Sequence, residues 1–187
     1  MNASPQPDLT SVAGANSRWT VVPESSTATF SVRDKLVGTT RGSLPITAGW
    51  VVTDADGSVV SSRVDLDLTR VDTGNAHRDR DLQKPSLLDG GGHPVISVHT
   101  GPTTPQVTQW TVPATLSARG ASCPLELHVS GTTTDQDHAQ VHVTARLDRT
   151  GLGMRVPTFI IGRYVDIDVA ALFERTGTPT DGRGEAS

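Results

Sequence analysis

Strict alternation of apolar and polar side chains is the feature that most constrains the fold of this chain. In the segment VVSSRVDLDLT, Val64, Leu66 and Leu68 fall on one face of an extended strand, and the polar side chains fall on the other. The same period recurs in TATFSVR, LELHVS, QVHVTARLD and YVDIDVA. Because successive side chains of a strand point to opposite faces, this period predicts strands with one buried face and one solvated face.

Less regular alternation predicts further strands around residues 19–22, 44–53, 94–100 and 109–118. The segments 54–58 (DADGS) and 129–138 (VSGTTTDQDH) have the composition of hairpin loops. This pattern amounts to about eight or nine strands. The only other elements that we expect are a helix at 75–84 and a short turn at 150–155.

The strands predict an all-β, antiparallel fold. Parallel strands covered by helices are apolar on both faces, whereas each clear strand here has one polar face. With almost no helix to cover them, the apolar faces must meet in a sandwich or a closed barrel, and alternation alone leaves both open. We expect a flexible tail over 1–17, one β domain over 18–174 and a second flexible tail over 175–187, since both ends are rich in Gly, Pro, Ser and Thr.

Composition argues against several classes of function. The formal net charge is −4 and no basic cluster is evident, so we expect neither nucleic-acid binding nor attachment to an anionic membrane surface. No apolar run is long enough to insert into a bilayer, and the first residues lack a basic region followed by an apolar run. These features predict a cytoplasmic protein. The chain has a single cysteine, Cys123, so no intrachain disulfide can form. We predict that Cys123 is a small buried apolar residue.

The stretch TGNAHRDRDLQ, residues 73–83, is the most chemically crowded part of the chain. Asn75 is a suitable helix N-cap, and Pro85 bars continuation of the helix. His77 and Asp81 would then share one helical face, where they could hold a metal ion or simply face solvent. No third ligand can be named, and neither a G-x-S-x-G motif nor a phosphate loop is present. The sequence therefore predicts no metal, no cofactor and no catalytic residues.

Motifs in and around this stretch resemble those of a known family. The most specific one, TGN-x-x-RD-x-x-L, is formed here by Thr73, Gly74, Asn75, Arg78, Asp79 and Leu82. A P-x-I strand follows at Pro94 and Ile96, and an S-x-x-x-F-x-V run precedes it at 26–32. In this order the motifs resemble the YceI-like family of polyisoprenoid-binding proteins, over a span from about Trp19 to Phe173.

The resemblance implies an extended, lipocalin-like antiparallel β-barrel with an elongated apolar tunnel. It also implies a long isoprenoid ligand, such as a polyprenyl phosphate or an isoprenoid quinone, and a homodimer. Gly74, Asn75 and a hydrogen-bonding cluster of Arg78 and Asp79 would then be structural, at a helical crossing over one end of the barrel. Leu87 and Leu88 stand where the family often has aromatic residues, and aromatic residues make up only 4% of the chain, so we expect a mainly aliphatic tunnel wall.

Alternation and the resemblance together name candidate site residues. The candidates for the tunnel lining are Phe30, Val32, Leu44, Ile46, Trp50, Val64, Leu66, Leu68, Ile96, Val98, Leu116, Val143, Leu147, Met154 and Phe159. The candidates for contact with a polar head group are Arg33, Arg41, Arg78 and Arg155. Each lining candidate could equally be ordinary core packing. Two alternatives remain: an enzyme acting on a lipid-like substrate in the same barrel, and a filled barrel that serves in stress or interaction without a small ligand.

Overall fold

The computed structural model describes residues 16–35, 38–106, 108–133, 135–154 and 161–177. Ten strands dominate it: β1 Ser17–Val21, β2 Thr27–Asp34, β3 Gly38–Leu44, β4 Ile46–Thr53, β5 Val59–Asp67, β6 Val95–Thr100, β7 Trp110–Ala118, β8 Ala121–Thr133, β9 His138–Asp148 and β10 Ile161–Gly177. The helical elements are α1 Ala76–Leu82 and three short 3₁₀ turns, η1 Pro23–Ser25, η2 Leu68–Arg70 and η3 Arg149–Leu152. Within the described residues, no helix is long and apolar enough to span a bilayer.

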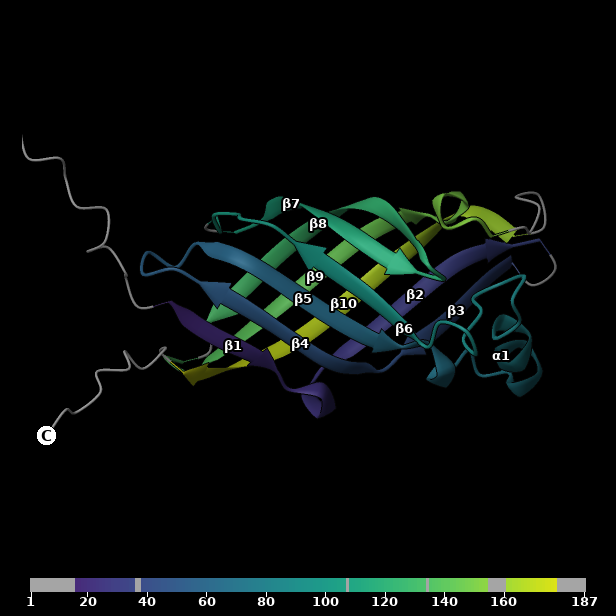
Figure 1. Ribbon diagram of the computed structural model, residues 1–187, viewed down its shortest axis with the longest axis horizontal. Helices are drawn as coiled ribbons and strands as arrows, with labels where there is room; N and C mark the ends of the chain where they lie inside the picture. The colour runs from purple at the N-terminus through teal and green to yellow at the C-terminus, as the bar shows by residue number, and fades with distance from the viewer. Residues whose placement is uncertain (1–15, 36–37, 107, 134, 155–160, 178–187) are drawn as a thin grey trace, which may run out of the picture.

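The strands form a closed antiparallel barrel (Figure 1). The ring runs β1-β4-β5-β6-β7-β8-β9-β10 and closes through pairing of β1 with β10. Strand β10, 17 residues long, pairs with β2 along its first part and with β1 along its last part. Strand β3 pairs with β2 and extends the sheet beside α1. The predicted all-β class is therefore confirmed, and closure decides for the barrel over the sandwich.

Alternation places the core inside this ring. In β7 every second residue from Val112 to Ala118 is buried, and its neighbours face outward. One buried cluster joins β7, β8, β9 and η3 around Leu116 and Leu147. A second cluster joins β1, β2, β4, β5 and β10 around Val21 and Phe173. Both clusters contain apolar residues that the period of two assigned to one face, such as Leu66, Leu125 and Leu147.

The strand limits differ from the prediction in two places. Strand β3, with the sequence GTTRGSL, was not predicted, because its polar residues show no alternation and only its pairing with β2 makes it a strand. The loop predicted at 129–138 is shorter, because Ser130 to Thr133 pair in register with residues of β9. Threonine favours strands, so this run extends the ladder where turn composition predicted a loop.

Helix α1 forms where the sequence predicted a helix. The Asn75 side-chain oxygen accepts the backbone N–H groups of His77 and Arg78, both at 3.1 Å, which is the geometry of an N-cap. Gly74 precedes it with φ of 71°, a conformation that favours glycine. The segment between η2 and β6, which carries α1, lies across one end of the barrel (Figure 1).

Candidate functional site

The barrel encloses a cavity of about 420 Å³ beneath α1. This volume lies within the usual range of small-molecule sites. Its wall is made mainly by aliphatic side chains from the inner faces of the strands, with Phe30 as the one aromatic lining residue among those described. A space with such a wall favours an apolar ligand.

Most predicted lining residues do line this cavity. They are Phe30, Val32, Leu44, Ile46, Val64, Leu66, Ile96, Val98, Leu116, Val143, Leu147 and Met154. Leu68 lies elsewhere: it is fully buried within η2, because the strand alternation of β5 ends at Asp67. Phe159 lies outside the described residues.

Trp50 was predicted to line the tunnel, but the structure places its side chain on the outer face. A β-bulge between Ile46 and Ala48 shifts the alternation of β4 by one residue. As a result Gly49 is buried next to Val21 and Val64, and Trp50 faces outward, with the Arg18 guanidinium 5.3 Å from its ring centre. The periodic pattern contains no sign of this bulge.

Other lining residues escaped the sequence analysis. Val165, Ile167 and Val169 line the cavity and were visible as one face of the YVDIDVA strand. Leu87 and Leu88 also line it, together with Leu82 of α1. Their segment has no strand periodicity, so only the tertiary fold shows that it covers the cavity.

The polar lining residues gather at the α1 end of the cavity. Apart from Thr29, they are Asp34, Thr40, Arg78, Asp81 and Arg149. Asp34 is the last residue of β2, and Arg149 follows directly after β9, so these residues lie where the strands reach the α1 end. The cavity therefore has a polar end.

The predicted cluster of Arg78 and Asp79 forms through a shared partner, Thr73. Arg78 Nε donates to Thr73 Oγ1 at 2.8 Å, and Nη2 donates to the Thr73 carbonyl at 2.9 Å. Asp79 accepts the Thr73 backbone N–H at 3.0 Å. Arg78 Nη1 also donates to Thr40 Oγ1 at 3.3 Å, which attaches α1 to strand β3. Thr40 is only 6% exposed, so this polar contact is shielded from water.

Two further arginines hold the same end together. Arg149, 2% exposed, donates from Nε to the Gly162 carbonyl at 2.8 Å and from Nη2 to the Ile161 carbonyl at 2.6 Å. Its burial lowers the pKa of the guanidinium. Arg119 donates to the carbonyls of Leu152 and Pro85, at 3.0 and 2.8 Å. It thereby connects η3 to the segment that covers the cavity.

The opposite end of the barrel is filled by packed side chains. Val21, Val112, Val129, Ala171 and Phe173 are each between 3% and 8% exposed, and none of them lines the cavity. Val112, Val129, Ala171 and Phe173 lie in the halves of β7, β8 and β10 that are farther from α1, and Val21, the last residue of β1, pairs with Phe173. Among the described residues, the cavity lining therefore does not extend into this packed region.

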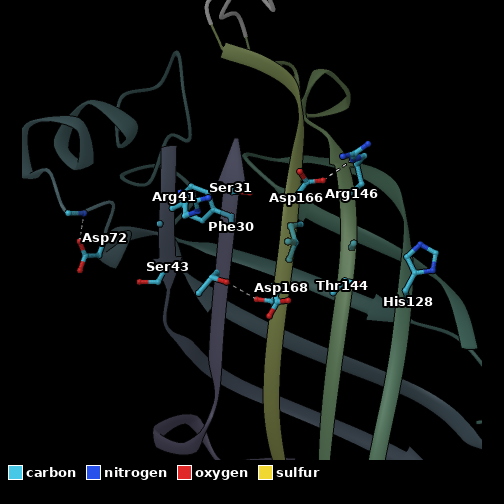
Figure 2. Close-up of a pocket in the computed structure, with 15 residues that line it drawn as sticks. Phe30, Ser31, Arg41, Ser43, Asp72, His128, Thr144, Arg146, Asp166 and Asp168 are labelled. Carbon is cyan, nitrogen blue, oxygen red and sulfur yellow. Dashed lines mark hydrogen bonds and ion pairs between the residues drawn. The ribbon is translucent and has the colours of Figure 1, made fainter. Parts of the chain in front are cut away.

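The other head-group candidates do not meet at the cavity. Arg33 is exposed and does not line it, and Arg155 lies outside the described residues. Arg41 lines a separate groove of about 820 Å³ on the outer face of β2, β3, β8, β9 and β10 (Figure 2). Of the four candidates, only Arg78 is placed at the cavity.

The outer groove is built from solvated pairs. Arg146 donates to Asp166 at 2.8 Å (Figure 2). His142, which lies beside the groove, is 3.0 Å from Asp168, and all four side chains are at least half exposed. Exposed pairs of this kind contribute little to stability. Among the described residues that line the groove, every titratable side chain is exposed.

His77 and Asp81 face solvent, which is one of the two alternatives that the sequence left open for this pair. Their side chains lie 3.4 Å apart, and His77 is 80% exposed. Asp81 also meets Lys84 at 2.6 Å, and the hydrogen bond from Lys84 lowers the pKa of the Asp81 carboxyl. In the part of the chain that the structure describes, no three His, Cys, Asp or Glu residues gather as a metal site.

The fold and the cavity define a class, a closed antiparallel β-barrel that encloses an apolar space of ligand size. Within that class, the family model of the YceI-like domain matches residues 19–173. The chain therefore belongs to the YceI-like family, as its motifs predicted.

Solved structures share this fold. BcnA of Burkholderia cenocepacia aligns with a TM-score of 0.71 and 15% identity, covering 81% of this chain and 98% of that one. A polyisoprenoid-binding domain of Saccharophagus degradans, implicated in plant cell wall breakdown, aligns with a TM-score of 0.67 and 12% identity, covering 84% and 98%. The YceI protein of Campylobacter jejuni aligns with a TM-score of 0.56 and 14% identity, covering 73% and 82%. The comparison with curated proteins finds no match.

Proposed function

We propose that this protein binds a long-chain isoprenoid lipid inside the barrel, for storage or transport. The proposal depends on one observation, the mainly aliphatic cavity of about 420 Å³ beneath α1. Each CH₂ group moved from water into such a space gains about 0.8 kcal/mol, so a prenyl chain needs no covalent or ionic anchor. Membership of the YceI-like family and the fold shared with a polyisoprenoid-binding domain support the same ligand class.

A binding role fits the described residues better than catalysis. Among the described residues, the lining contains no serine, cysteine or histidine that could act as a nucleophile or a base. Cys123 is buried outside the lining, and burial raises the pKa of its thiol, which disfavours the reactive thiolate. The cavity itself argues against the alternative of a filled barrel without a small ligand.

Organic extraction of the purified protein, followed by mass spectrometry against a denatured-protein blank, tests the proposal. We expect an isoprenoid in near-stoichiometric amount, and the spectrum would identify its chain length and head group. An empty extract from protein made in its native host, together with no uptake of added polyprenol, would contradict it. The homodimer and the cytoplasmic location stay predictions, which sedimentation and cell fractionation would test.

A further inference from the structure

Strand β3 has an edge that is largely unpaired among the described residues. It comes last in the strand order of the sheet, with β2 as its strand neighbour. On its other side, Ser43 exchanges backbone hydrogen bonds of 2.8 and 3.0 Å with Asp72 in an antiparallel bridge. The chain then turns away, because the Asp72 carboxylate accepts the Gly74 backbone N–H at 2.8 Å and Gly74 has φ of 71°. The bridge is therefore not extended into a further strand.

Alternation determines which backbone groups lie open at this edge. The N–H and C=O groups of Ser43 face away from β2, so those of Arg41 and Thr39, at alternate positions of the same strand, face away from β2 as well. Within the described residues, the backbone of neither Thr39 nor Arg41 is bonded on that side, and both residues are exposed. Open N–H and C=O groups of this kind are a template for pairing with another strand.

The same edge carries two basic side chains. Arg41 lies on the outer face of β3 (Figure 2), and Arg33 lies on the same face of β2, opposite Thr39 in the register. The two arginines are therefore diagonal neighbours. Both are exposed, and among the described residues neither forms an ion pair or a side-chain hydrogen bond. On the same face, by contrast, Arg146 is paired with Asp166. The open edge thus combines unpaired backbone groups with uncompensated positive charge.

We propose that the free edge of β3 binds an extended, acidic segment of another protein as an additional antiparallel strand. The strand pairs of this sheet and the Ser43–Asp72 bridge are all antiparallel. A carboxylate opposite Arg41 lies beside its guanidinium, and a glutamate opposite Thr39 reaches Arg33 across the small threonine. A second copy of β3 would instead bring like charges together, which is unfavourable. The proposal does not depend on a ligand in the barrel, because Arg33, Thr39 and Arg41 do not line the cavity.

Short synthetic peptides in which glutamate alternates with valine test the proposal. In an antiparallel strand whose glutamates lie opposite Arg41 and Thr39, the glutamate N–H groups face β3 and the valine N–H groups face away. One peptide therefore has free amides, a second is N-methylated on the glutamates, and a third is N-methylated on the valines. A fourth peptide carries lysine in place of glutamate.

Binding is measured by NMR titration of the full chain. We expect the glutamate peptide to shift the backbone amide signals of Thr39 and Arg41, and the valine-methylated peptide to do the same. Methylation on the glutamates should abolish binding, and the lysine peptide should bind about tenfold more weakly or less, because it meets the arginines with like charge. Arg41→Ala should weaken the glutamate peptide by about threefold to fivefold, as expected for an exposed ion pair. Arg63→Ala, the matched control on the outer face of β5, should leave the affinity unchanged.

Four results would overturn the proposal. They are equal binding of the lysine peptide, undiminished binding of the glutamate-methylated peptide, amide shifts confined to other strands, and no binding of any peptide at millimolar concentration. A shift of the Thr39 and Arg41 signals with protein concentration alone would overturn it in favour of a second copy of this chain at the same edge.

Discussion

The end of the barrel beneath α1 and the end near β1 share most of their strands and the same alternation, yet one is hollow and the other is filled. At the β1 end, Phe173 and Trp19 pack into the space between the strands. At the α1 end the inward side chains are mostly aliphatic, and the segment carrying α1 covers the opening from outside. The comparison shows that alternation decides which side chains point inward, whereas their volumes and the cover decide whether space remains.

The largest expected effect is a difference in the loss of stability when an aromatic side chain is truncated at each end of the barrel. Phe173→Ala should lower the free energy of unfolding by about 3–5 kcal/mol, because it opens a void in a packed core. Phe30→Ala should cost clearly less, because the Phe30 side chain already borders the cavity. Denaturant unfolding of both variants measures the difference. Equal losses would mean that the α1 end is as tightly packed as the other.

Replacing an alanine by a larger residue at each end tests the same difference between the filled end and the hollow end. Ala171→Leu in the filled end should cost about 1–3 kcal/mol through overpacking. Ala145→Leu should cost less, because its new atoms can grow into the cavity that Ala145 lines, and it should reduce uptake of a long polyprenol. Unfolding curves and polyprenol titrations check both expectations. A destabilised Ala145→Leu that still binds the full-length chain would contradict the position of the cavity.

The attachment of α1 depends on Arg78. Arg78→Ala removes three hydrogen bonds to Thr73 and Thr40, so we expect a loss of about 1–3 kcal/mol from the groups left unsatisfied. Arg80→Ala is the matched control, since Arg80 makes one exposed bond to the Ala76 carbonyl. Thermal unfolding measures both. An Arg78→Ala variant with full stability but altered ligand affinity would assign Arg78 a direct contact with the ligand.

Arg119 should set the rate at which ligand exchanges. Arg119→Ala removes the bonds to Pro85 and Leu152, whose net worth of about 1–2 kcal/mol corresponds to roughly tenfold faster opening. We expect association and dissociation of a fluorescent alkyl probe to accelerate together in stopped-flow measurements. Arg63→Ala, on the outer face of β5, should leave both rates unchanged. Unchanged rates in Arg119→Ala would place the entrance elsewhere.

The smallest effects concern pH, and the two ends should respond in opposite directions. At the α1 end, the hydrogen bond from Arg163 holds the pKa of the Asp148 carboxyl well below its usual range. Its contribution to stability is present above about pH 4 and is lost as pH falls toward the lowered pKa. At the other end, the hydrogen bond to Asp135 raises the pKa of His138. That contribution is present below about pH 6.5 and is lost as pH rises through the raised pKa.

Variants separate these two responses. Asp148→Asn should weaken the acid dependence of stability, and Asp135→Asn should lower the pKa of His138 in an NMR titration. Both groups are solvent exposed, so we expect small changes. A His138 titration that is the same with and without Asp135 would contradict the pairing seen at the end of β8.

Much of the fold could be predicted because its signals are local. Alternation in β5, β7, β8, β9 and β10 follows from backbone geometry, and the N-cap at Asn75 follows from the hydrogen-bonding reach of one side chain. The features that the sequence did not predict depend on contacts between segments that are far apart in the chain. Strand β3 exists through its partner, and the bulge that turns Trp50 outward arises from pairing between β4 and β5.

By itself, the sequence determined the all-β class, the inward faces of most strands, the helix after Asn75 and, through its motifs, the YceI-like family. Only the tertiary structure decided that the ring closes through β1 and β10, that Leu82, Leu87 and Leu88 cover a cavity, and that the other end is filled. The physical reason is that alternation depends on neighbouring residues. Closure and empty volume depend instead on side chains that are far apart in the sequence and meet only in the folded barrel.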